Sequence, residues 1–98
     1  KIFMPEQRPE EFNTFHTFVI QFENRDLLKE KLAEVGIETG IHYPIPIHLQ
    51  PASINLGYKL GDFKITENQA TRILTLPVNQ YLNKEDIEYV SQTINSLA

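Results

Sequence analysis

The 98-residue chain contains no cysteine. Disulfide bridges, thiolate nucleophiles and cysteine-based zinc sites are therefore excluded, and the composition is compatible with a reducing cytoplasm. No apolar run approaches the roughly 20 residues that a membrane-spanning helix needs. The first residues also lack the apolar region and the small-residue cleavage site of a signal peptide. We therefore expect a cytoplasmic protein without a membrane partner.

Positive charge is also scarce. Nine lysines and arginines stand against 13 aspartates and glutamates, which gives a formal net charge of −4. A protein that binds nucleic-acid backbones or anionic membranes needs clustered basic residues, so neither is expected as a partner. A chain of this length with 41% hydrophobic residues has enough apolar side chains for one small core. We expect a single domain cut from a longer polypeptide.

Hydrophobic periodicity predicts an α/β (α+β) fold, with a small open sheet of about three strands and helices mainly on one face. The expected strands cover residues 14–22, 37–43 and 74–78. The expected helices cover residues 24–35, 51–56, 66–74 and 83–97. Gly36 is expected to end the first helix, Asn83 to cap the last, and Thr66 to open the one between through a capping box with Gln69. Residues 1–13 hold two prolines and are expected to form an extended arm.

The segment with the most unusual chemistry contains three prolines within eight residues, Pro44, Pro46 and Pro51. Such spacing favours a stiff, polyproline-like path. His42, Tyr43 and His48 lie on it, and a rigid backbone lowers the entropic cost of presenting polar side chains to a ligand. Histidine can move protons or hydrogen-bond an anion near neutral pH, and tyrosine adds a flat face. The alternative is a tight connection whose imidazoles are ordinary surface groups, and composition alone favours this second interpretation.

Three apolar side chains alternate with these prolines, Ile45, Ile47 and Leu49. We expect them to form an exposed patch on which another part of the protein docks.

Other catalytic and binding motifs are missing. The spacing of His42 and His48 matches no common zinc-ligand pair, so no metal site is expected. Gly57 and Gly61 are too far apart for a phosphate-binding loop, and no serine has the context of a nucleophile elbow. The acidic residues stand at helix starts or on exposed faces, where helix dipoles and solubility account for them. No catalytic residue is therefore expected in this chain.

One run of residues resembles a known family. His42-Tyr43-Pro44-Ile45-Pro46-Ile47-His48-Leu49-Gln50-Pro51-Ala52, followed by Gly61-Asp62-Phe63 and Leu74-Thr75-Leu76-Pro77, is similar to the C-terminal small domain of the DegT/StrS family of pyridoxal-phosphate-dependent sugar aminotransferases. The likeness covers nearly all of the chain but only the last part of a family member. Lys64 stands where the family usually has proline, and Thr75 where it more often has serine.

The resemblance implies the C-terminal domain of a type I aminotransferase that works as a homodimer. Residues 1–13 would be the linker from a large domain, and residues 14–98 the small domain. The large domain would hold pyridoxal phosphate and its Schiff-base lysine, so no cofactor-binding residue is expected here. The resemblance implies that His42, Tyr43 and His48 bind the substrate.

The full enzyme would transfer an amino group from an amino-acid donor, with glutamate expected, to a keto-sugar nucleotide in polysaccharide or amino-sugar biosynthesis. Two alternatives stay open at this point. One is a sugar dehydratase of the same family, and the other is a non-catalytic regulatory or binding module.

Overall fold

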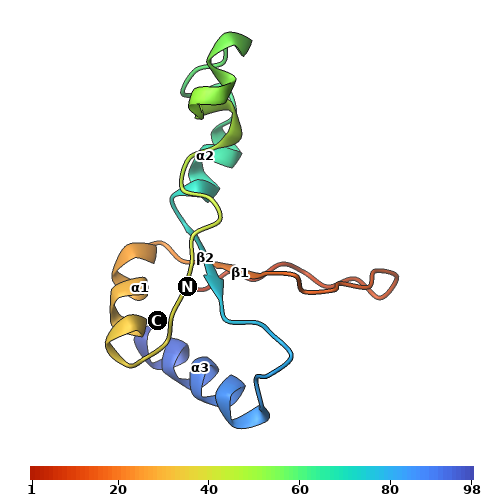
Figure 1. Ribbon diagram of the computed structural model, residues 1–98, viewed down its shortest axis with the longest axis vertical. Coiled ribbons are helices and arrows are strands. Elements are labelled where there is room, and N and C mark those ends of the chain that lie inside the picture. Colours follow the sequence, from red (N-terminus) through yellow and green to blue (C-terminus); the bar gives the residue numbers. More distant parts are fainter.

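The computed structural model describes residues 1–98, which form a small body with two projecting segments (Figure 1). The body comprises residues 18–37 and 73–98. The N-terminal extension, residues 1–17, runs out from the body and back, and the arm, residues 42–72, leaves in a different direction. The Cα radius of gyration is 15.5 Å, whereas a compact domain of about 100 residues has about 13 Å. The excess reflects these two projections.

The sheet consists of two antiparallel strands, β1 (Phe18–Gln21) and β2 (Ile73–Leu76). Ile20 pairs with Leu74, and both side chains are buried on the face that meets the helices. The expectation of about three strands was wrong, because the segment 37–43 forms only an isolated bridge from Gly40 to Thr75. A glycine weakens a strand, and the proline that follows at 44 cannot donate to a ladder.

Two helices cover one face of this sheet (Figure 1), as predicted: α1 (Arg25–Glu34) and α3 (Lys84–Leu97). The core lies between these helices and the strands, and its buried apolar members are Ile20, Leu28, Leu32, Ile37, Leu74 and Ile94. Gly36 follows α1 with φ at +82°, which confirms the predicted left-handed helix end. Val35 next to α1 and Ile87 in α3 lie outside this core and are about half exposed.

Asn83 caps α3 as predicted. Its side chain accepts a hydrogen bond from the backbone N–H of Asp86 at 2.8 Å, and the Asp86 carboxylate accepts one from the N–H of Asn83 at 3.1 Å. This reciprocal pair is a capping box, which satisfies two N–H groups that the helix itself leaves free. None of the helices has the length and apolar composition needed to cross a membrane.

The arm contains two short 3-10 helices, η1 (Ile47–Leu49) and η2 (Pro51–Leu56), and the helix α2 (Lys64–Ala70). The helix predicted at 51–56 is confirmed, whereas η1 interrupts the expected polyproline-like path. The prediction of a helix over 66–74 was wrong at both ends, and Thr66 caps nothing because α2 begins at Lys64. Ile73 and Leu74 leave the helical pattern because pairing with β1 buries them better than a further helical turn would.

Candidate functional site

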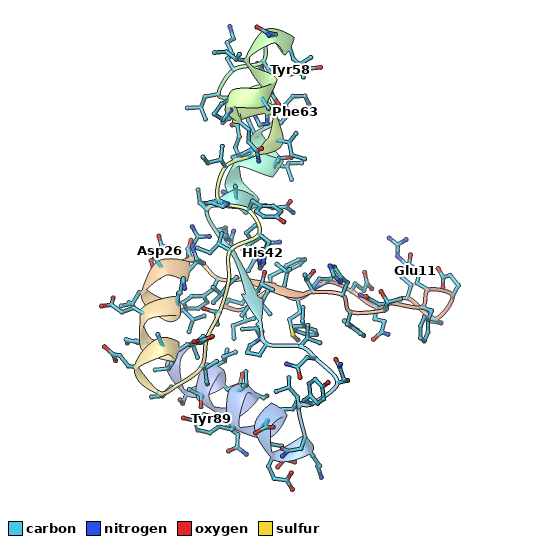
Figure 2. All side chains as sticks on the ribbon, viewed as in Figure 1. Glu11, Asp26, His42, Tyr58, Phe63 and Tyr89 are labelled. Carbon is cyan, nitrogen blue, oxygen red and sulfur yellow. The ribbon has the colours of Figure 1, made fainter.

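The base of the arm holds the first two of the predicted site residues, His42 and Tyr43. Figure 2 shows His42 where the arm leaves the body, beside β2. Its Nδ1 lies 2.9 Å from the Thr75 Oγ1, and Thr75 is a buried residue of β2. A Cβ atom at Gly40 would stand 2.7 Å from the His42 Cε1, so the imidazole can approach this strand edge only because residue 40 is glycine.

Tyr43 lies next to His42, and its hydroxyl group has no hydrogen-bond partner. Its ring meets the imidazole edge-on, with ring centroids 5.3 Å apart and an interplanar angle of 88°. The residue is 68% exposed, and its hydroxyl makes no hydrogen bond within the chain. The base of the arm therefore presents two neighbouring groups: the imidazole of His42, which Thr75 holds in place, and the phenol of Tyr43, which has no hydrogen-bond partner.

His48 lies farther along the arm and is buried. Its Nε2 lies 2.8 Å from the Glu67 Oε1, and because a carboxylate only accepts, Nε2 carries the proton. The ring also packs against Phe63, whose centroid is 4.8 Å away, and Phe63 in turn contacts Tyr58 (Figure 2). His48 thus connects the limb that leaves the body with the limb that returns.

Glu67 is the centre of this contact. Besides His48, its carboxylate accepts from the backbone N–H of Gly61 at 2.9 Å and of Phe63 at 3.5 Å. The hydrogen bond from His48 is the main reason that the pKa of Glu67 lies below its ordinary value, and the two N–H groups act in the same direction against the effect of desolvation. Sequence reasoning missed this partner of His48, because the two residues are 19 positions apart and only the loop between them brings them together.

Arg25 fixes the returning limb to the body. The side chain is buried, and its Nη1 donates to the carbonyl oxygens of Ala70 at 3.2 Å and Ile73 at 2.9 Å, while Nε donates to Asp26 at 2.6 Å. Sequence reasoning missed this residue as well. The available signal was its position, since a cation in the first turn of a helix opposes the helix dipole and needs another reason to be there.

Of the three apolar side chains beside the prolines, two are exposed as expected and the third is not. Ile45 and Ile47 are 50% and 78% exposed, and Leu49 is half-buried. The bend that carries them is held by its own hydrogen bonds, from Ser53 Oγ to the carbonyl of Ile47 at 2.6 Å and from Gln50 Nε2 to that of Ile45 at 3.2 Å. A bend fixed in this way presents its isoleucines outward.

The chain's own residues do not fit pyridoxal phosphate, which needs an enclosed lysine. Lys29 donates its ammonium group to the carbonyl of Thr39. The other five lysines are exposed: Lys1, Lys31, Lys59, Lys64 and Lys84. No group of three or more metal-ligating side chains comes together either.

Comparison with known proteins gives a consistent picture. The profile of the DegT/DnrJ/EryC1/StrS aminotransferase family matches residues 1–95. The erythromycin biosynthesis sensory transduction protein EryC1 of Saccharopolyspora erythraea is 39% identical over 97% of this chain and 26% of its own. The dTDP-3-amino-3,6-dideoxy-alpha-D-galactopyranose transaminase of Aneurinibacillus thermoaerophilus is 31% identical over 96% of this chain and 25% of its own.

A solved structure agrees with these relatives. DesV of S. venezuelae, crystallised in complex with a ketimine intermediate, superposes with a TM-score of 0.91 at 30% identity, over 98% of this chain and 26% of DesV. The chain thus spans about a quarter of the length of the relatives that it matches. The fold, the motif at the arm and these matches show that the chain belongs to the DegT/DnrJ/EryC1/StrS aminotransferase family.

Proposed function

We propose that these residues are the C-terminal part of a pyridoxal-phosphate-dependent aminotransferase that transfers an amino group from an amino acid to a keto-sugar nucleotide. The observation that carries the proposal is the family match over residues 1–95. The name of the Aneurinibacillus relative, a transaminase of a dTDP-amino sugar, supports the substrate class. Glutamate is the expected donor, the cytoplasm the expected compartment, and polysaccharide or amino-sugar biosynthesis the expected pathway.

The division of labour follows from what this chain lacks. Pyridoxal phosphate acts as an electron sink when bound, and it belongs to the rest of the polypeptide because no lysine here is enclosed. The full-length protein is proposed to be a homodimer. The present residues are proposed to contact the sugar nucleotide and to keep water away from it.

Three residues of the arm have roles in this proposal. The Tyr43 hydroxyl is free to hydrogen-bond a sugar hydroxyl or a phosphate oxygen, and Thr75 holds the His42 ring beside it. His48 uses Nε2 for Glu67, which leaves Nδ1 for the ligand. Its first task in the proposal is to fix the arm, so that Tyr43 and His42 need no reordering when substrate binds.

Steady-state kinetics of the full-length protein tests these roles. In Tyr43→Phe, we expect the KM for the sugar nucleotide to rise about tenfold, as for the loss of one hydrogen bond, with the amino-acid half-reaction unchanged. Tyr81→Phe is the matched control, because Tyr81 is 85% exposed and lies outside the arm. Equal kinetics for the two variants and the unmodified protein would remove Tyr43 from the site.

A non-catalytic regulatory module is a second candidate, favoured by the name of EryC1 as a sensory transduction protein. It predicts that the full-length protein binds sugar nucleotides but forms no aminated product when supplied with pyridoxal phosphate and an amino donor. Product analysis by mass spectrometry separates the two functions.

A further inference from the structure

A hollow lies at the β1 edge of the sheet, whereas His42 lies beside β2. It has a volume of about 400 Å³ and is lined by Phe3, Gln21, Lys64, Ile65, Asn68, Gln69 and Arg72. Phe3 reaches it because its backbone pairs with Gln21 of β1 through two hydrogen bonds of 2.9 Å. None of these residues belongs to the site proposed above.

The charge of this hollow is opposite to that of the chain. Its lining has two cations, three side-chain amides and no carboxylate, whereas the whole chain carries a net charge of −4. An uncompensated pair of cations in one concave surface attracts anions.

The guanidinium of Arg72 lacks an anionic partner within the chain. The residue is half-buried, its Nε is fully buried without a hydrogen-bond acceptor, and its guanidinium takes part in no ion pair. A desolvated N–H donor without an acceptor is unfavourable, and the guanidinium of Arg72 carries its positive charge without a carboxylate partner. An anion in the hollow could supply acceptors and compensate that charge.

We propose that this hollow binds a diphosphate group, with Arg72 and Lys64 as its charge partners. Planar, forked donors suit phosphate oxygens, and amide side chains such as Gln69 and Asn68 can donate to the remaining ones. Phe3 is 55% exposed at the rim and offers its ring to a flat group attached to the diphosphate. The shared chemistry is met either by free pyrophosphate or by a nucleoside diphosphate.

Isothermal titration of the full-length protein with inorganic pyrophosphate tests the proposal. Arg72→Gln is expected to weaken binding at this site tenfold or more, and Lys64→Gln several-fold, because each removes a charge-assisted contact. Lys31→Gln is the matched control: Lys31 is an exposed cation of α1 outside the hollow, and its loss should leave the dissociation constant unchanged. If circular dichroism shows that Arg72→Gln does not fold, the test rests on Lys64→Gln alone, because Lys64 is exposed and its substitution should not affect folding.

A parallel titration with uridine diphosphate separates the two sources. Tighter binding than pyrophosphate, with the advantage lost in Phe3→Ala, assigns a nucleoside diphosphate, and equal binding of both with no effect of Phe3→Ala assigns free pyrophosphate. The proposal is overturned if pyrophosphate does not bind, or if it binds equally to the unmodified protein, Arg72→Gln and Lys64→Gln. Because the outcome is decided by the Arg72 and Lys64 variants, which lie outside the site of Tyr43 and His42, its failure leaves the proposed transamination untouched.

Discussion

The body and the arm keep their shapes by different means. In the body, six apolar side chains from two strands, two helices and the segment after α1 form a closed core. In the arm, only three residues are buried, namely His48, Ser53 and Ala70, and two of them are polar. Burial of apolar surface therefore stabilises the body, while hydrogen bonds fix the path of the arm. An arm of this kind has a defined shape but exposes the apolar side chains that a core would have covered.

The largest loss of stability is expected from a substitution in the core of the body. Leu32→Ala removes a side chain with no exposed surface, and we expect it to lower the free energy of unfolding by about 2–5 kcal/mol. Urea denaturation followed by circular dichroism measures the change. Leu60→Ala is the control in the arm, where the side chain is 75% exposed, and its effect should stay within about 0.5 kcal/mol. Equal effects in the two variants would contradict the contrast between body and arm.

The next largest effect belongs to the junction. Arg25→Met leaves the carbonyls of Ala70 and Ile73 without their side-chain donor, at an expected cost of about 1–3 kcal/mol. Hydrogen exchange should accelerate most in α2, because the returning limb loses its attachment to the body. Arg8→Met breaks only an exposed ion pair with Glu11 and serves as the control. Unchanged exchange in α2 would show that Arg25 does not hold the limb.

A smaller, pH-dependent effect is expected within the arm. Because the pKa of Glu67 lies below its ordinary value in the folded chain, its contribution to stability is complete above that ordinary value and is lost as the pH falls through the lowered pKa. The amide signals of Gly61 and Phe63 in NMR spectra should therefore shift together on acidification from about pH 5 to about pH 3. In Glu67→Gln this joint shift should vanish. A wild-type titration curve for Gly61 in that variant would contradict the assignment.

The smallest effect is expected at the exposed isoleucines. Ile47→Ser should change the stability of the 98-residue chain by no more than about 0.5 kcal/mol, because the side chain is 78% exposed. If the patch docks on the rest of a full-length protein, the same substitution should lower the Tm of that protein by several degrees. The same Tm with and without the substitution would show that nothing docks there.

Much of the body could be predicted from sequence because its signals are local. The spacing of Leu28 and Leu32, the glycine after α1 and the cap at Asn83 each lie within a few residues of what they specify. The prediction of a third strand was wrong: Gly40 and Pro44 weaken that segment locally, but only its non-local partner Thr75 reveals that the pairing stops at a single bridge.

The arm was harder to predict for the same reason. His42, Tyr43 and His48 could be singled out from the proline-rich motif, but their partners could not. Thr75 and Glu67 follow their histidines by 33 and 19 positions, and no periodic pattern reports such separations. The hollow beside Arg72 could not be predicted either, because it is formed by the first residues of the chain together with α2.

The position of Arg25 has a consequence for how the molecule moves. One guanidinium nitrogen donates to two carbonyls that flank the turn between α2 and β2, that of Ala70 in the arm and that of Ile73 in the body, so a rotation of α2 about that turn would break the bond to Ala70. The arm is consequently coupled to the rotation of α1 rather than free to swing. A shift of the first helix, for example on contact with a neighbouring domain, would therefore pull on Ala70 and on the returning limb of the arm.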